Sequence, residues 1–246
     1  MKFNVVLSAA VAVAFSAGLA LAATPFGGDD TGFVSPTKAD GKCADGVSKN
    51  VGSLTGALIK CNIKDSDSKA KVNDGSSFDG QACQNAAAGK FDAKVGPLVC
   101  NPCVDKNYIR DLTVGLVNVN GGVVFCDGTS GTAQDSPDTG FVPATKAIAK
   151  CEDGTAKNAG KLVGAIGKCH IKTSDTLAKG KTFDEEGCET TAKGKFDAAA
   201  AKLTACPSCI DVPGGGQAGL RDLVELLLDS NNGLAYCASP SGAFLN

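Results

Sequence analysis

The fold of this chain is set by a stretch of 23 residues, 42–64, which reads KCADGVSKNVGSLTGALIKCNIK. The stretch returns 108 positions later as residues 150–172, which read KCEDGTAKNAGKLVGAIGKCHIK. Apolar or cysteine side chains in the first copy recur at the three- and four-residue spacing of one helical face, at positions 43, 47, 51, 54, 58 and 61. We therefore expect each copy to contain a long helix, which runs over about residues 39–64 in the first copy.

The similarity between the copies extends over nearly all of the chain that follows the N-terminal apolar run. Each of the twelve cysteines has a counterpart, in the pairs 43/151, 61/169, 83/188, 100/206, 103/209 and 126/237. A second helix should begin at Asp184 (or at Thr182 with Glu185), with a buried face of Cys188, Ala192, Phe196, Leu203 and Cys206. A third helix is expected over about 108–117 and 219–229, although the valine-rich first of these also suits a strand.

These patterns predict a mainly α protein, a tandem duplication of a disulfide-stapled helical module. Each module would be an antiparallel helix hairpin with a third short helix. The N-terminus has the positive start, the apolar run and the Ala20-Leu21-Ala22 site of a secretory signal peptide. We expect cleavage after Ala22, no membrane span after cleavage, and a secreted or periplasmic location. The expected division is a signal peptide at 1–22 and six-cysteine helical modules at 23–130 and 131–246.

Composition favours covalent stabilisation. An even number of cysteines in an exported chain points to disulfides rather than free thiols. Trp is absent and aromatic residues make up 5% of the chain, so each module can bury little apolar surface and would depend on covalent links. The formal net charge is -2 with lysines scattered along the chain, which gives no electrostatic reason to expect nucleic acid as a partner.

Helix geometry restricts which cysteines can pair. Cys43 and Cys61 share one face but lie about 27 Å apart, far beyond the ~7 Å that a disulfide allows between Cα atoms. In an antiparallel hairpin, Cys61 meets Cys83 at the loop end, and Cys43 lies near Cys100 and Cys103. We predict the bridges 43–100, 61–83 and 103–126 in the first module and 151–206, 169–188 and 209–237 in the second. Exchange of Cys100 with Cys103 is nearly as favourable.

Two segments have the C-x-x-C form of a thiol–disulfide active site, Cys100-Asn101-Pro102-Cys103 and Cys206-Pro207-Ser208-Cys209. Such sites usually lie in a βαβ context, which is not predicted here. Zinc would need reduced thiols, and haem attachment would need a histidine after the motif. We interpret all four as structural half-cystines, and assign no catalytic residue, no metal ligand and no cofactor.

The chain has a single histidine, His170, and its counterpart in the first copy is Asn62. Catalysis by a Ser-His-acid or Cys-His arrangement would therefore depend on one residue in one copy. We interpret His170 as a surface residue near the end of a helix.

The two arginines, Arg110 and Arg221, occupy matched positions, and each precedes Asp-Leu. The planar guanidinium can hold a carboxylate in a geometry that lysine cannot reproduce. The favoured interpretation is a structural clamp, onto Asp92 or Asp197 for example, and the alternative is contact with an anionic ligand.

Each copy also contains a Thr-Gly-Phe-Val segment, at residues 31–34 and 139–142. The segments could dock elsewhere as a short strand. The favoured expectation is that Phe33 and Phe141 each fill the hairpin of their own module, because a module with few aromatic residues needs a large apolar side chain in its core.

The runs Lys-Cys-x-Asp-Gly, Lys-Cys-His-Ile-Lys, Phe-Asp-Glu-Glu-x-Cys and Cys-Pro-x-Cys resemble a cysteine-rich helical repeat of predicted exported bacterial proteins. The resemblance covers nearly the whole chain after the signal peptide. That repeat has no established activity, so the resemblance transfers no functional residue. The first copy departs from it, with Asn62 at the position of His170 and Asp79-Gly80-Gln81 at the position of Asp184-Glu185-Glu186.

The favoured function is a secreted, disulfide-stabilised, non-enzymatic binding or structural protein, with an unknown protein or small molecule as its partner. The first alternative is a carrier of small apolar ligands. A continuous cavity lined by Leu54, Leu58, Leu112 and Leu116 would support it, and tight packing of those positions would count against it. The second alternative is a thiol–disulfide oxidoreductase that uses the C-x-x-C pairs.

Overall fold

The structure, a computed structural model, describes residues 24–70, 78–134, 137–210 and 216–238. The expected signal peptide lies outside these residues. None of the described helices is long and apolar enough to cross a membrane. In chain order the elements are β1 (Pro25–Gly27), β2 (Asp30–Phe33), α1 (Lys38–Ala70), α2 (Gly80–Val95), α3 (Lys106–Val119), α4 (Gly121–Val124), α5 (Lys146–Leu177), α6 (Glu185–Ala200) and α7 (Gln217–Asn231), with short 3-10 turns at Gly128–Ser130 and Asn232–Leu234.

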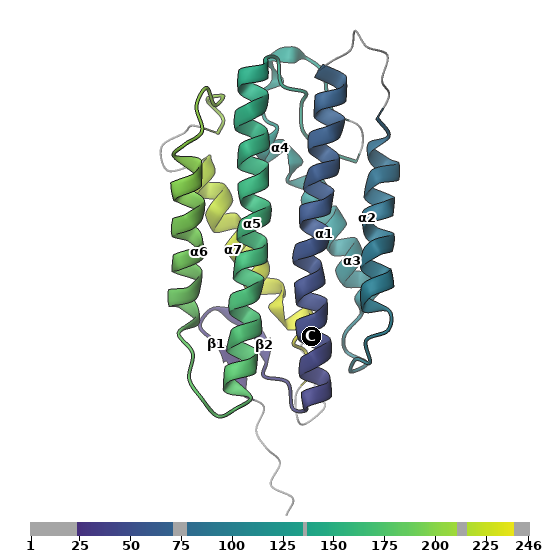
Figure 1. Cartoon of the computed structure of the whole chain (residues 1–246), viewed down its shortest axis with the longest axis vertical. Coiled ribbons are helices and arrows are strands. Elements are labelled where there is room, and N and C mark those ends of the chain that lie inside the picture. The colour runs from purple at the N-terminus through teal and green to yellow at the C-terminus, as the bar shows by residue number, and fades with distance from the viewer. Residues whose placement is uncertain (1–23, 71–77, 135–136, 211–215, 239–246) are drawn as a thin grey trace, which may run out of the picture.

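Two long helices, α1 and α5, lie side by side at the centre of a helical bundle (Figure 1). Helix α2 folds back along α1 and α6 folds back along α5, so each copy forms the predicted antiparallel hairpin. Helices α3 and α7 cross behind the long helices, and the valine-rich segment of the first copy is a helix rather than a strand. The predicted mainly α, disulfide-stapled fold is confirmed.

The predicted apolar stripes form the core. Leu58 on α1 and Ile166 on α5 are fully buried, and each lies in a cluster with the phenylalanine of its partner helix, Phe91 or Phe196. Asp184 caps α6 as predicted, because its side chain accepts a hydrogen bond from the backbone N–H of Gly187 at 3.0 Å.

The long helices approach each other at glycine. A Cβ atom on Gly52 would lie 3.3 Å from the Cα of Gly164, which is closer than side chains normally pack. Each glycine in a helix costs about 1 kcal/mol relative to alanine. The close contact between the two backbones explains why these costs are tolerated in both long helices.

The N-terminal segment of each copy packs against the other copy. In the first segment, the hydroxyl of Thr31 donates to the backbone oxygen of Asp229 at 2.9 Å, and the N–H of Phe33 donates to the backbone oxygen of Tyr236 at 2.7 Å. In the second, the N–H of Phe141 donates to the backbone oxygen of Phe125 at 2.7 Å. Phe33 is only half-buried and Phe141 is 37% exposed. The expectation that these phenylalanines fill their own hairpins was therefore wrong.

All twelve cysteines are paired, and two bridges differ from the prediction. The bridges Cys43–Cys100, Cys61–Cys83, Cys151–Cys206 and Cys169–Cys188 are present as predicted. The remaining two connect the copies, as Cys103–Cys237 and Cys126–Cys209. The predicted bridge 103–126 fails because α3, which is about 21 Å long, separates its two cysteines. The same constraint excludes 209–237, because α7 lies between those positions.

Peptide mapping of the oxidised protein should recover disulfide-linked peptides that contain Cys103 with Cys237 and Cys126 with Cys209. Replacement of Cys103 and Cys237 by serine should lower the free energy of unfolding by about 4 kcal/mol, because the unfolded chain regains the entropy of a long loop. Recovery of a 103–126 peptide from the native protein would contradict this connectivity.

A buried carboxylate supports the segment around one of these cross-links. Glu152 is fully buried on α5, and its Oε1 accepts hydrogen bonds from the backbone N–H groups of Cys126 and Asp127, both at 3.1 Å. Burial raises the pKa of Glu152 to about 7, and the charges of Asp127 and Asp153 add to the increase. Ala44 occupies the matched position in the first copy.

This carboxyl should make the protein less stable as the pH rises through 7. The pKa of Glu152 is 4.5 in its ordinary state and about 7 when folded, so its stabilising contribution is complete below pH 4.5 and is lost as the folded carboxyl ionises. In Glu152→Gln the amide oxygen can still accept both hydrogen bonds. The unfolding free energy of the variant relative to the parent should therefore increase by on the order of 3 kcal/mol between pH 4.5 and pH 8. Urea unfolding across this range tests the prediction, and a difference independent of pH would contradict it.

Candidate functional site

His170 lies inside the protein, with only 2% of its surface exposed. It follows Cys169 on α5, and Glu189 follows Cys188 on α6. Because these two cysteines form a disulfide, the next residue on each helix is brought to the same point, and Nε2 of His170 lies 3.0 Å from Oε1 of Glu189. The interpretation of His170 as a surface residue was therefore wrong.

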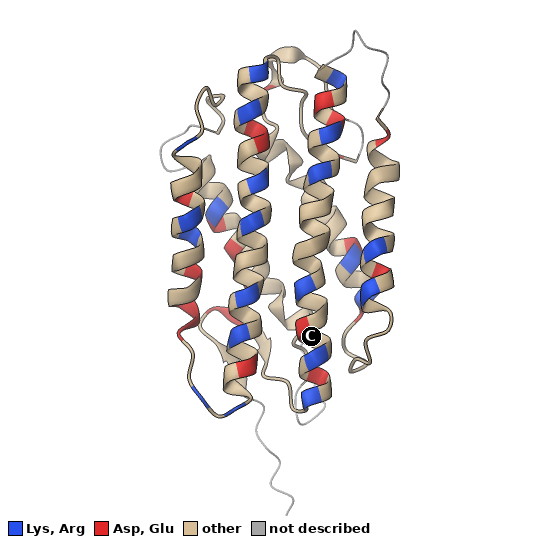
Figure 2. Cartoon of the chain, in the orientation of Figure 1, with Lys and Arg blue, Asp and Glu red and all other residues tan. Residues whose placement is uncertain are grey.

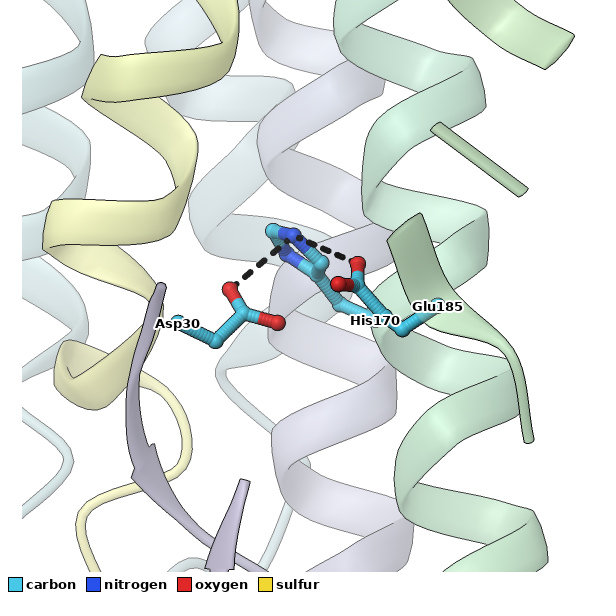
Figure 3. A group of neighbouring side chains, drawn as sticks. All are labelled: Asp30, His170 and Glu185. Atoms are coloured by element: carbon cyan, nitrogen blue, oxygen red, sulfur yellow. Dashed lines mark ion pairs between the residues drawn. The ribbon is translucent and has the colours of Figure 1, made fainter. Parts of the chain in front are cut away.

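Three further carboxylates approach the same imidazole nitrogen. Asp30 Oδ1 lies 3.2 Å from Nε2, Asp229 Oδ1 lies 3.3 Å from it and Glu185 Oε1 lies 3.6 Å from it. Figure 3 shows Asp30 reaching the ring from β2 and Glu185 from the start of α6. Asp229 lies on α7, and Glu185 and Glu189 are one helical turn apart on α6. We name these five residues the His170 cluster.

The charges of the His170 cluster are not balanced by protein groups. Burial raises the pKa of Asp30 to about 7 and, together with Glu189 and Asp30, raises that of Glu185 to about 9. Burial alone would lower the pKa of His170, but Asp229, Glu189 and Asp30 raise it to about 10. Even a protonated imidazole supplies one positive charge to four carboxyl groups. The cluster must therefore take up further protons or a cation to become neutral.

Hydrogen bonding leaves most of these oxygens unsatisfied. Among the residues that the structure describes, seven buried carboxylate oxygens of the cluster have no hydrogen-bond partner, on Asp30, Glu185, Glu189 and Asp229. An unpaired carboxylate in a protein interior costs several kcal/mol. Buried carboxylate oxygens without hydrogen bonds are suited to hold a proton or a positive ion.

The first copy has the same frame with different chemistry. The residues that match the cluster are Asn62, Gly80, Gln84, Asn118 and Asp138. Gln84 Nε2 donates to Asn118 Oδ1 at 3.0 Å, and Gln84 Oε1 accepts from Asn118 Nδ2 at 3.2 Å. Asn62 Nδ2 donates to Asp138 Oδ1 at 2.9 Å. We name this set the amide cluster. Its amides bond to one another and to the carboxyl group of Asp138, whose pKa burial raises to about 6, so the frame can be filled with one carboxyl group in place of four.

The geometry of the His170 cluster matches the spacing of ligands around a metal. Ligands about 2.1 Å from an ion and separated by 90–109° lie ~3.0–3.4 Å from one another, and the four contacts to Nε2 span 3.0 to 3.6 Å. Two sets of three residues each bring their ligand atoms within 4.8 Å of one another, Asp30 with His170 and Glu185, and His170 with Glu189 and Asp229. An imidazole with carboxylates is a ligand set for divalent transition metals.

Further charged groups lie around this cluster. Asp29 and Glu186, both exposed, come within reach of Glu185 and form a third acidic group with it. Lys193 forms an ion pair with Glu225, and the charge of the nearby Glu189 raises the pKa of Glu225. Acidic residues at the start of α6 and in the turn between β1 and β2 thus lie together at this end of the bundle (Figure 2).

A cavity of about 190 Å³ adjoins the cluster between α1, α3, α5 and α7. Leu112 and Leu116 line it, as the apolar-carrier hypothesis requires, together with His170 at one side. Leu54 and Leu58 do not line it, because they are buried in the packed core of the first copy. The cavity therefore has the predicted walls on α3 but not on α1.

The arginines lie at structural contacts. Arg110 Nη1 donates to Asp92 Oδ2 at 2.9 Å, and Arg221 Nη1 donates to Asp197 Oδ2 at 2.7 Å. These are the carboxylates considered for a structural clamp, and each contact joins the third helix of a copy to its second. Contact with an anionic ligand stays a prediction.

The C-x-x-C cysteines are all in use. Cys100 and Cys206 pair with the first cysteine of their copies, and Cys103 and Cys209 form the bridges between copies. No bridge closes within either motif, and all twelve cysteines are oxidised. In each motif, therefore, the first cysteine forms a bridge within its own copy and the second forms a bridge to the other copy.

The His170 cluster was missed, although a signal for it was present in the aligned copies. At four matched positions the second copy replaces a neutral residue by an ionisable one, as His170 for Asn62, Glu185 for Gly80, Glu189 for Gln84 and Asp229 for Asn118. Such linked changes indicate residues that share one site.

No family model, curated protein or solved structure matches this chain.

The amide cluster supplies a direct test of the charge imbalance. The variant H170N/E185G/E189Q/D229N places the residues of the first copy in the second. With a chelator present at pH 8, we expect this variant to be more stable than the parent by roughly 2 kcal/mol, because buried carboxylates no longer repel one another. Denaturant unfolding gives the difference.

The reverse change is the control. Replacement of Gln84 by Glu and Asn118 by Asp adds two buried charges to the amide cluster and should destabilise the protein under the same conditions. If the fourfold variant is no more stable than the parent in chelator, the charges of the His170 cluster are balanced within the protein.

Proposed function

We propose that this chain is an exported, disulfide-stabilised metal-binding protein whose His170 cluster holds one divalent transition-metal ion. The observation that carries the proposal is the convergence of four buried carboxylates on one imidazole nitrogen, with seven oxygens that no protein donor satisfies. A structural role for the charges alone is disfavoured, because the amide cluster fills the same frame with a single carboxyl group, Asp138, to which two amide side chains donate.

The ligand chemistry selects the kind of ion. Calcium and magnesium prefer sites made only of oxygen, whereas one imidazole nitrogen with carboxylate oxygens suits Zn²⁺, Mn²⁺ or Fe²⁺. Thiolate ligands are excluded because every cysteine is in a disulfide. Each of the two sets that contain His170 offers one nitrogen and two carboxylate ligands, which is enough to hold such an ion.

The disulfides suit this role in an oxidising compartment. Six bridges hold the helices that carry the ligands without any reduced thiol. Export through the N-terminal signal peptide belongs to the same proposal. So does membership in the exported bacterial repeat group, whose runs Lys-Cys-His-Ile-Lys and Phe-Asp-Glu-Glu supply His170 and Glu185.

Titration of the chelator-treated, oxidised protein with Zn²⁺ and Mn²⁺ by calorimetry tests this function. We expect one equivalent of metal to bind, and elemental analysis after dialysis to find it retained. At a free metal concentration of 100 times the dissociation constant, the protein should gain about 2.7 kcal/mol of stability. His170→Asn should weaken binding at least ~10-fold, since loss of even an outer partner of a ligand costs that much.

The two copies provide a matched control. Asp30→Asn removes a ligand from the His170 cluster and should also weaken binding, whereas Asp138→Asn changes the equivalent residue of the amide cluster and should leave metal affinity unchanged. Equal affinities for the parent, His170→Asn and Asp30→Asn would refute the proposed site.

A further inference from the structure

We propose that the central cavity binds a small apolar molecule about the size of one aromatic ring, beside the metal position. Its walls come from matched residues of the two copies. Leu112 and Leu116 on α3 face it, and their counterparts Leu223 and Leu227 on α7 do the same. The cavity therefore lies between the third helices, which each pack on a long helix but make little contact with each other.

The size and the lining determine the occupant. An aliphatic cavity of about 150 Å³ is large enough to take up benzene, and this cavity, which is partly open, measures about 190 Å³. Most lining side chains on α3 and α7 are leucine, isoleucine or valine. Water would find few partners there, whereas an apolar molecule with one ring would gain contact with both helices. A long acyl chain would exceed this volume.

The cavity and the cluster share His170. The imidazole lines the cavity while its Nε2 faces the carboxylates, so a molecule in the cavity would lie next to a metal ligand. Asn62 lines the cavity at the matched position of the first copy. The occupant is therefore placed near a metal on one side and near neutral amides on the other. This adjacency, unlike the cavity site itself, rests on the proposed metal function.

Fluorobenzene is a suitable probe, because its ¹⁹F resonance reports binding directly. In chelator-treated protein we expect saturable binding, seen as a shifted and broadened resonance. Leu116→Trp and Leu227→Trp, which fill the cavity from opposite copies, should each weaken binding at least about tenfold. Leu226→Trp is the control, since Leu226 neighbours Leu227 but is 63% exposed and does not line the cavity; it should bind as the parent does.

Circular dichroism and a count of intact disulfides establish that each variant is folded, and the two filling variants provide independent readings. Absence of saturable binding by the parent would overturn the proposal. So would parent-like binding by a folded Leu116→Trp or Leu227→Trp variant.

A second measurement separates the cavity from the metal site. Protein loaded with Mn²⁺ should strongly enhance the ¹⁹F relaxation of bound fluorobenzene, and Glu189→Gln, which changes a metal ligand outside the cavity lining, should reduce the enhancement while fluorobenzene still binds. Binding without enhancement, in protein shown to hold Mn²⁺, would overturn the adjacency. Binding to protein that takes up none of Mn²⁺, Zn²⁺ and Fe²⁺ would leave the cavity site established and refute the metal function instead.

Discussion

The structure depends on the disulfide that closes the loop end of each helix hairpin. Cys61–Cys83 and Cys169–Cys188 join residues whose immediate successors point into the bundle, and this places Asn62 beside Gln84 and His170 beside Glu189. A covalent bond thus determines a buried polar contact in each copy. Because the bond limits how far the helices can separate, it can hold side chains that repel each other as firmly as side chains that attract.

The two copies use this constraint in opposite ways. In the amide cluster, glutamine and asparagine supply both donors and acceptors, so Gln84 and Asn118 satisfy each other while buried. In the His170 cluster the donors are the imidazole and a carboxyl group that holds a proton, as Glu185 does at neutral pH with its pKa raised to about 9, and these are too few for the oxygens of Asp229, Glu189 and their neighbours. The same backbone therefore carries one centre whose amides pair with each other and one whose carboxyl groups need further protons or a cation.

Much of this architecture could be predicted from the sequence, because it depends on local periodicity. The spacing from Cys43 to Cys61 predicts a helix with one buried face, and the hairpin that follows explains four of the six bridges. The two bridges between the copies and the crossing of the N-terminal segments depend on long-range packing, about which periodicity carries no information. The helix between Cys103 and Cys126 nevertheless excludes a bridge within the copy, once its length is considered.

His170 shows why the candidate site was harder to predict. A single histidine with an asparagine counterpart is most simply interpreted as a surface residue, and only comparison of all the differing positions shows that its partners change with it. Asp30 could not have been found in this way, since Asp138 in the other copy is also an aspartate. Its importance comes from the crossing of the N-terminal segment, which carries Asp30 from the first copy to the helices of the second.

This crossing makes the two copies depend on each other. Asp30 joins a cluster whose other members lie on α5, α6 and α7, and Asp138 completes the amide cluster of the first copy. The bridges Cys103–Cys237 and Cys126–Cys209 also join the two copies covalently. A single copy would therefore lack both the aspartate of its polar centre and the partners for two of its cysteines. The central cavity has the same requirement, because one wall comes from α3 and the other from α7. The proposed cavity site thus belongs to the pair of copies, and the proposed metal site draws Asp30 from the first copy while His170, Glu189 and Asp229 come from the second.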